Sequence, residues 1–345
     1  MTVSWSASML LQLMIGREQH IAPASVSCDA NPSQWLRKKQ GNWLVHCTGS
    51  CCPLHIMSIY RNAIWFLNGI QQYTRKGYAA ASKDFETKDL DVSVVGRSFL
   101  ITGANSGIGK ATAMAIAKKG GTVHMVCRNK DRAEEARTEI VSEFGNAEVY
   151  IHVVDMSQTR KVWEFAEAFK KEHPSLNVLI TVSSGGMLVQ SLRADDLQSE
   201  KGHFDGVMVY AQNKRQQVVL TEHWAKANPV IHFSVMHPGW VDTPAVSAAM
   251  PQFHQMMGDR LRSVDQGADT VVWLALSRAA ARKRSGRFFQ DRKPVPMHLP
   301  LAWTHSSAEE IHSFITQLET LARAVQSRHD ADLRGQTDAS VPQFV

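Results

Sequence analysis

The 345-residue sequence is poor in cysteine and has no long apolar run. Four of its five cysteines lie at or before residue 52, a scarcity in the remaining chain that favours a reducing, cytoplasmic compartment. No apolar run reaches the roughly 18 to 20 residues of a membrane-spanning helix. The short apolar segment 9–15 lacks both a preceding positive cluster and a small-residue cleavage site, which argues against a signal peptide.

Basic residues exceed acidic residues only slightly. The chain has 38 Lys and Arg against 32 Asp and Glu, and the basic residues are scattered, so nucleic acid is not an expected partner. With 44% hydrophobic and 20% charged residues, the composition is that of a globular protein. The length is compatible with one large domain and terminal extensions.

Segment 1–56 shows no sustained hydrophobic period, and we predict an unstructured extension. A group of Cys and His side chains within it has two interpretations: unstructured thiols or a zinc site. The spacing lacks the paired C-x₂-C and H-x₃-H pattern that zinc sites use, so no metal is expected. The group consists of His46, Cys47, Cys51, Cys52 and His55.

Segment 57–94 is predicted to be an N-terminal helix and linker. Between 58 and 78, apolar residues alternate with Arg61, Arg75 and Lys76, as in an amphipathic helix. Two roles stay open for it: packing on the protein body, or peripheral membrane contact through 57–78.

From residue 95 the sequence alternates between strand and helix patterns, which is typical of an α/β fold with a parallel sheet. We therefore predict a Rossmann-type doubly wound domain over 95–325 and a disordered polar tail over 326–345. The expected strands are 98–102, 122–126, 148–154, 177–180, 181–184, 230–236 and 286–290. The expected helices are 109–119, 130–144, 159–173, 210–226, 265–277 and 307–327.

One junction in this alternation is abnormal. Two strand-like segments, 177–180 and 181–184, follow each other with neither turn nor helix between them. Adjacent parallel strands need a crossover of a dozen or more residues. Either the two segments form one strand, leaving the sheet one strand short, or the second half of the sheet shifts its register.

A glycine-rich turn joins the first expected strand to the first helix. Such a turn lets the backbone approach a pyrophosphate, whose charge the helix amides and dipole then stabilise. A purely structural glycine turn is the alternative, and the strand–turn–helix context argues against it. The candidate cofactor-binding residues here are Gly103, Asn105, Ser106, Gly107, Ile108 and Gly109.

Two polar side chains follow the next two strands. Arg128, placed where NAD-binding proteins usually carry an acidic residue, favours the 2′-phosphate of NADP over NAD. Asp155 has the position to accept a hydrogen bond from an adenine amine. A surface arginine and a turn-forming aspartate are the alternatives.

Tyr210 and Lys214 are four residues apart, and hence on one face of a helix. A phenol ionises near pH 10, so a neighbouring ammonium would favour its use as a general acid and base. Tyr-x₃-Lys also occurs by chance, and here its place downstream of the glycine turn gives it weight. Both are candidate catalytic and cofactor-binding residues: Tyr210 is expected to transfer the proton beside the nicotinamide, and Lys214 to favour ionisation of the phenol and to bind the nicotinamide ribose.

Ser184 ends a strand upstream of this tyrosine, where its hydroxyl could polarise a substrate oxygen; we prefer it to Ser183. A Ser/Gly loop without catalytic meaning is the alternative. Farther on, Pro238 and Gly239 form a turn beside the expected nicotinamide, and Thr243 could bond its carboxamide or the phosphates. Pro-Gly is also simply a favourable turn.

Taken in this order, the motifs resemble the short-chain dehydrogenase/reductase family over most of residues 57–325. The resemblance implies an NADP(H)-dependent oxidoreductase acting on a carbonyl or secondary alcohol. It also implies that an Asn-Asn-Ala-Gly signature and a helix with a catalytic asparagine are missing between Ile180 and Thr181, a block of about 45 residues by the size of a βαβ unit.

The direct junction of Ile180 and Thr181 is typical of a splice variant or a gene-model artefact. We therefore expect the enzymatic activity of this chain to be weak or absent. The alternative hypothesis is an inactive dinucleotide-binding or interaction protein. Substrate and oligomeric state cannot be predicted from the sequence.

Overall fold

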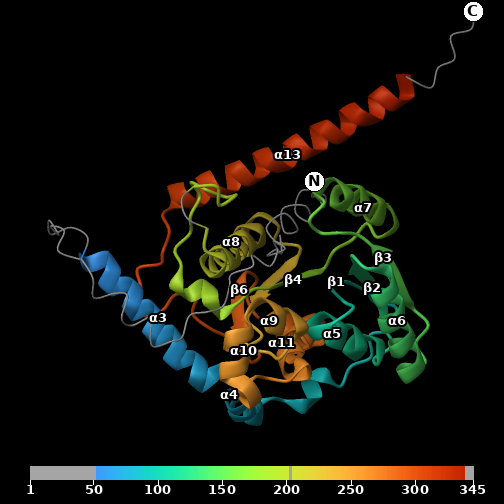
Figure 1. Ribbon diagram of the computed structural model, residues 1–345. Coiled ribbons are helices and arrows are strands. Elements are labelled where there is room, and N and C mark those ends of the chain that lie inside the picture. The colour runs from blue at the N-terminus through green and yellow to red at the C-terminus, as the bar shows by residue number, and fades with distance from the viewer. Residues whose placement is uncertain (1–51, 202–203, 339–345) are drawn as a thin grey trace, which may run out of the picture.

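The computed structural model describes residues 52–201 and 204–338 (Figure 1). Its helices are α3 (Cys52–Gln72), α4 (Arg75–Ala81), α5 (Gly107–Ala117), α6 (Lys130–Phe144), α7 (Thr159–Glu172), α8 (Gly206–Ala227), α9 (Pro244–Ala249), α10 (Pro251–Met257), α11 (Val264–Leu276), α12 (Arg278–Ala281) and α13 (Ala308–Asp338). Short 3-10 helices are η1 (Ser82–Asp84), η2 (Thr87–Leu90), η3 (Gly185–Val189) and η4 (Gly258–Arg260). The strands are β1 (Ser98–Thr102), β2 (Thr122–Cys127), β3 (Val149–Val153), β4 (Val178–Val182), β5 (His232–Met236), β6 (Arg287–Gln290) and β7 (Lys293–Pro294).

The predicted α/β alternation is confirmed, and from β1 to α7 the element ends differ from prediction by at most two residues. The short helices α9 and α10 were not predicted. Each has a proline at its first position, where the missing N–H costs nothing and the fixed φ suits a helix. These two prolines are therefore the sequence signal that the prediction did not use.

The two ends of the described chain differ from the prediction. The single helix expected over 58–78 is divided into α3 and α4, because Thr74 caps α4 by accepting a 3.3 Å hydrogen bond from the Gly77 N–H. Helix α3 already begins at Cys52, whereas residues 1–51 of the predicted extension, with most of its Cys and His, lie outside the described residues. Helix α13 continues to Asp338, so the boundary predicted at residue 326 falls inside a helix.

The strands form two separate sheets, ordered β1-β2-β3 and β4-β5-β6-β7. All neighbours are parallel except the β6–β7 pair. The segments around the abnormal junction make one strand, β4, in which Val178 pairs with His232 and Val182 with Met236. Within the described part of the chain, β1 has a ladder only with β2, and β4 only with β5. The break between the sheets therefore lies between β1 and β4.

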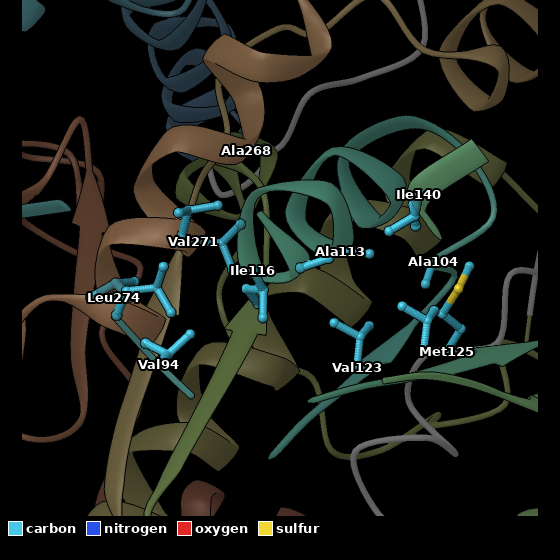
Figure 2. Packing of buried hydrophobic residues seen from close by; sticks show 14 of the residues in the cluster. Val94, Ala104, Ala113, Ile116, Val123, Met125, Ile140, Ala268, Val271 and Leu274 are labelled. Atoms are coloured by element: carbon cyan, nitrogen blue, oxygen red, sulfur yellow. The ribbon is translucent and has the colours of Figure 1, made fainter. Parts of the chain in front are cut away.

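Side-chain packing joins the two sheets where hydrogen bonding does not. Helices α5 and α11 pack against each other, with Ile116 of α5 beside Val271 of α11 in Figure 2. The same buried cluster takes Met125 from β2 and Met236 from β5. On the other face, Leu100 of β1 and Leu179 of β4 pack on a second cluster, which α7, α8 and α13 cover. Both faces of the broken sheet thus keep a shared apolar core.

A buried ion pair connects the segments that surround the C-terminal ends of β5 and β6. The guanidinium of Arg262 donates to both carboxylate oxygens of Asp291, at 2.7 and 3.0 Å, and both side chains are buried. Arg262 also donates to the carbonyls of Gln72 at 2.6 Å and Pro238 at 3.2 Å. One side chain therefore holds the end of α3, the turn after β5 and the turn after β6 together.

Aromatic packing reinforces this connection. The Trp240 ring, one residue beyond Gly239, lies 5.7 Å from the Trp65 ring and 5.2 Å from the Phe253 ring, measured between centroids. Its backbone N–H donates to the Tyr73 carbonyl at 2.8 Å. Helix α3 is thus packed on the turn that follows β5.

Replacement of Asp291 by Asn should strongly destabilise the protein. Asn tolerates the positive φ of 49° at this position, so the main change is that Arg262 remains buried without its counter-charge. We expect the free energy of unfolding to fall by about 3 to 5 kcal/mol, measured by urea denaturation. Asp259→Asn, an exposed control, should change it by less than about 0.5 kcal/mol. Equal stabilities of the two variants would contradict the role of the pair.

Candidate functional site

The turn between β1 and α5 has the geometry that only glycine allows at key positions. Gly103 and Gly107 have φ of +66° and +51°. A Cβ built on Gly109 would lie 2.3 Å from the Gly103 carbonyl oxygen, so no side chain fits there. A Cβ on Gly103 would meet nothing within 4 Å, which places open space directly beside the turn.

At the start of α5, Ser106 has the extended backbone of an N-cap but its side chain makes no capping hydrogen bond. The helix therefore begins without the side-chain acceptor that usually satisfies its first amides. On the far side of the turn, a Cβ on Gly107 would approach the Thr243 side chain to 3.4 Å. The structure thus brings Thr243 beside the glycine turn.

Arg128 and Asp155 line the same open hollow of about 550 Å³ at the ends of β2 and β3, together with His152 and Lys161. Arg128 is exposed and directly follows β2. One carboxylate oxygen of Asp155 accepts from the Ser157 N–H at 2.9 Å and from its hydroxyl at 2.8 Å. Asp155 therefore forms a turn, the alternative left open above, while also facing this hollow.

Tyr210 and Lys214 lie on α8, and the Lys214 ammonium is 5.4 Å from the centre of the Tyr210 ring. The ammonium donates to the Val182 carbonyl at 3.1 Å, and the Ser183 hydroxyl donates to the Lys214 carbonyl at 2.9 Å. The end of β4 is therefore fixed against α8. The ring of Tyr210 is about half exposed, so it can meet a molecule from solvent.

The two serines after β4 have different surroundings. Ser183 is buried and its hydroxyl is used by α8, whereas Ser184 is partly exposed. The Ser184 hydroxyl accepts from the Gly186 N–H at 3.2 Å and caps η3. As an acceptor in that bond the hydroxyl still has its own proton to donate, which is what polarising a substrate oxygen requires.

His237 connects this part of the site to the turn after β5. Its ring is completely buried, 4.4 Å from the Tyr73 ring, and a Cβ on Gly185 would lie 2.9 Å from its Nε2. Neither ring nitrogen has a hydrogen-bond partner among the described residues. Burial, with a smaller contribution from Arg262, lowers the pKa of His237 to about 3, so the ring is neutral near pH 7.

Similarity to known proteins identifies the family to which this chain belongs. A family profile described as short chain dehydrogenase matches residues 97–213. Dehydrogenase/reductase SDR family member 12 from Bos taurus is 54% identical over 315 residues, covering 77% of this chain and 99% of that protein. The Homo sapiens protein of the same name is 53% identical with the same coverage. This chain belongs to the short-chain dehydrogenase/reductase family.

More distant relatives include retinol dehydrogenase 12 from Homo sapiens, 27% identical over 281 residues, covering 66% of this chain and 88% of that protein. Members of the short-chain dehydrogenase/reductase family are NAD(P)-dependent oxidoreductases, and this chain is identified as one of them. The fold class and the type of enzyme predicted from the sequence are therefore confirmed.

The geometry of the glycine turn fits a dinucleotide. Open space lies beside Gly103, the start of α5 has no side-chain cap at Ser106, and the Thr243 side chain closes the other side. These are the features that bind phosphate through backbone amides. Asn105 and Ile108 lie within the same turn, partly buried.

Apart from Arg128 and Asp155, the predicted site residues come from two parts of the structure, the glycine turn with its neighbour and the end of β4 with α8. Gly103 to Gly109 and Thr243 belong to the first, and Ser184, Tyr210 and Lys214 to the second. Pro238 and Gly239 lie between them, and a Cβ on Gly239, where φ is +84°, would be 2.4 Å from the Arg262 side chain.

Sequence reasoning missed Arg262 and Tyr73, which hold that connecting turn. Neither belongs to a motif, and no spacing in the sequence pairs Arg262 with Asp291. His237, which precedes the predicted turn residues Pro238 and Gly239, is not among the predicted site residues. Complete burial of its ring, with both nitrogens unpaired, became visible only in the structure.

Acidification should destabilise the protein through His237. Its folded-state pKa is lower than the unfolded value of about 6.5, so between pH 6.5 and 3 the unfolded chain binds a proton that the folded protein does not. At pH 5 this costs about 2 kcal/mol relative to pH 7. His237→Phe, which keeps a ring beside Tyr73, should make the free energy of unfolding less dependent on pH.

His312→Asn is the matched control, because His312 is exposed on α13. Its pH profile of urea denaturation should follow that of the unmodified chain. If His237→Phe had the same pH profile as His312→Asn, the assignment of this destabilisation to His237 would be wrong.

Proposed function

We propose that this chain binds NADP(H) at the turn 102–109 and reduces a carbonyl, or oxidises a secondary alcohol, at Tyr210. The observation that carries the proposal is the fixed geometry around α8. Tyr210 and Lys214 share a helix face, and the Ser183 hydroxyl ties the end of β4 to that helix at 2.9 Å. Ser184 follows directly on this fixed end.

In the direction of reduction, the carbonyl carbon would accept the hydride that NADPH supplies when it is bound at this turn. Ser184 donates a hydrogen bond to the carbonyl oxygen and so stabilises the negative charge that develops there. Tyr210 gives its phenolic proton to that oxygen, which completes the alcohol. Lys214 stabilises the resulting phenolate, to which solvent returns a proton, and it is the residue we assign to the nicotinamide ribose.

Arg128 is the residue that we assign to the 2′-phosphate, which makes NADP(H) the preferred cofactor over NAD(H). Its guanidinium is exposed at the end of β2 and lines the hollow that Asp155 also lines. A cation there complements a phosphate, whereas an acidic residue would favour the free ribose hydroxyls of NAD. Asp155 is assigned to the adenine amine, while Pro238, Gly239 and Thr243 are assigned to the nicotinamide side.

The catalytic domain is proposed to comprise residues 95–325, with 57–94 as an accessory helical segment. A carbonyl or alcohol of low molecular mass is the proposed substrate, and the exposed apolar side chains near Tyr210 favour an apolar one. These side chains are Phe204, Val207 and Met208. A cytoplasmic location is proposed from the low cysteine content of this domain.

Turnover is proposed to be weak. The alignment with the bovine relative extends over 315 residues but takes in 77% of this 345-residue chain, about 266 residues. About 49 positions of the relative thus have no counterpart here, a number close to the block of about 45 residues that we propose is missing at Ile180–Thr181, as in a splice variant or gene-model artefact. The family's catalytic asparagine belongs to that block, and with it the proton relay to lysine.

A second candidate function, an inactive dinucleotide-binding protein, is favoured by one specific observation. Strands β1 and β4 belong to different sheets, so the cofactor turn after β1 and the serine after β4 are not held by a common ladder. Catalysis depends on sub-ångström placement of reacting groups, whereas phosphate binding depends only on the first sheet and α5. Binding can therefore persist where turnover does not.

NADPH should stabilise the protein more than NADH does. At a cofactor concentration of about 100 times Kd, binding to the folded state alone adds about 2.7 kcal/mol, measurable as an increased midpoint of thermal unfolding. Arg128→Ala should reduce the NADPH shift to the size of the NADH shift. Arg132→Ala, an exposed arginine on α6, is the control and should leave both shifts unchanged. Equal NADPH and NADH shifts in the unmodified chain would contradict the assignment of Arg128.

Tyr210→Phe should lower kcat for carbonyl reduction by about 100-fold or more, because it removes the transferable proton. The NADPH-dependent thermal shift should not change. Tyr150→Phe removes a phenol hydroxyl that bonds only locally to Glu148, and it should retain full activity. The measurement is NADPH oxidation in the presence of a panel of apolar ketones and aldehydes.

The two candidate functions separate in the same experiment. Turnover that Tyr210→Phe abolishes supports the reductase, whereas an intact NADPH shift without oxidation of NADPH supports the inactive binding protein. Turnover that survives Tyr210→Phe would contradict the assignment of the acid and base.

A further inference from the structure

Helix α3 is apolar on its outward face as well as on its inward face. Ile64 and Trp65 pack inward on the protein body. Four residues on the opposite side follow the helical spacing i, i+4, i+8 and i+11 and are all exposed, Leu67 to 64% of its surface. They are Ile59, Ala63, Leu67 and Ile70. A surface helix normally presents polar residues outward, so this face needs an explanation.

A second apolar segment lies beside α3. The loop before α13 is held against the helix by hydrogen bonds from the Tyr60 hydroxyl to the Pro300 carbonyl, at 3.1 Å, and from Arg61 to the Trp303 carbonyl, at 3.4 Å. In this loop Leu301 is 74% exposed and Trp303 75% exposed. Figure 1 shows α3 at the edge of the molecule, with the chain leading to α13 passing next to it.

The loop has a fixed conformation that keeps both side chains in solvent. Leu301 and Trp303 have φ of +55° and +51°, an unfavourable region for large side chains, while Ala302 and Thr304 between and after them are buried. Thr304 bonds to His298 at 2.8 Å. A strained backbone that exposes a leucine and a tryptophan is typical of a binding surface rather than of an ordinary loop.

The charge of α3, α4 and the loop itself is of one sign, while the exposed Glu309 and Glu310 follow the loop at the start of α13. From Cys52 to Lys83 the sequence has no Asp or Glu and four basic residues, Arg61, Arg75, Lys76 and Lys83. The loop 295–307 also has no acidic residue. Arg75 and Lys76 are exposed just beyond the end of α3. This charge complements an anionic surface.

We propose that the outward face of α3 and the loop residues Leu301 and Trp303 form a docking surface for an anionic phospholipid bilayer. An apolar helix face lies in the plane of the interface, tryptophan prefers the headgroup region, and basic side chains are attracted to anionic lipid. Within residues 52–201 and 204–338 no helix is long and apolar enough to cross a bilayer, so the contact is peripheral. This proposal does not depend on cofactor binding or turnover.

The test is co-sedimentation of the full chain with phosphatidylcholine vesicles with and without phosphatidylserine. The chain should bind the vesicles that contain phosphatidylserine, and added salt should weaken binding because it screens the basic residues. Leu301→Asn with Trp303→Asn should weaken binding about tenfold or more, since it removes two inserting side chains. Asn suits the positive φ at both positions, so this variant should fold.

A second variant, Leu67→Gln with Ile70→Gln, tests the helix face and should also weaken binding. The matched control is Val230→Asn, which changes a residue that is 79% exposed before β5 and should bind like the unmodified chain. Thermal unfolding of each variant verifies that it is folded.

Three results would overturn the proposal: a folded chain that binds neither kind of vesicle, equal binding by all variants, or a dimer in solution that these variants dissociate. The dimer would assign the surface to a second copy of the chain.

Discussion

Parallel strands that lie side by side must be joined by a crossover of a dozen residues or more, and nothing separates Ile180 from Thr181. The segments on the two sides of this junction therefore become one strand, β4, which pairs with β5. A ladder from β4 to β1 is not formed in the described chain, and the sheet is divided in two. Packing of α5 on α11 and the two apolar clusters then have to hold the halves together.

Each half carries a different part of the proposed site. The first sheet and α5 carry the glycine turn, which needs only local backbone geometry at Gly103 and Gly109 to bind phosphate. The second sheet and α8 carry Ser184, Tyr210 and Lys214. The Arg262–Asp291 pair fixes the Pro238 turn between them. Under the proposed function, cofactor binding is thus the more robust property and turnover the more vulnerable one, because only turnover requires both halves in register.

The sequence predicts the local parts of this structure well, and its limits have physical causes. The strand and helix from 98 to 173 follow hydrophobic periodicity, and the glycine turn follows from steric rules that hold for any chain. The extent of α13, and the division of the helix predicted over 58–78 into α3 and α4 at Thr74, depend on tertiary packing and capping, which hydrophobic periodicity does not contain. The Arg262–Asp291 pair and the buried His237 ring depend on contacts between segments far apart in sequence. Segments 177–180 and 181–184 could form one strand or shift the register of the sheet. The pairing of β4 with β5 decides this, and no local sequence pattern specifies that contact.

Amide hydrogen exchange with and without NADPH measures whether a chain with a divided sheet keeps an ordered cofactor turn. We expect slow exchange in β2 and β5, which have partner strands on both sides, and faster exchange in β4. NADPH should slow exchange in 98–109 while leaving β4 unchanged. Uniformly fast exchange would mean an unfolded core, and slowing that extends equally to β4 would mean a continuous sheet. Either result would contradict a divided sheet that keeps an ordered cofactor turn.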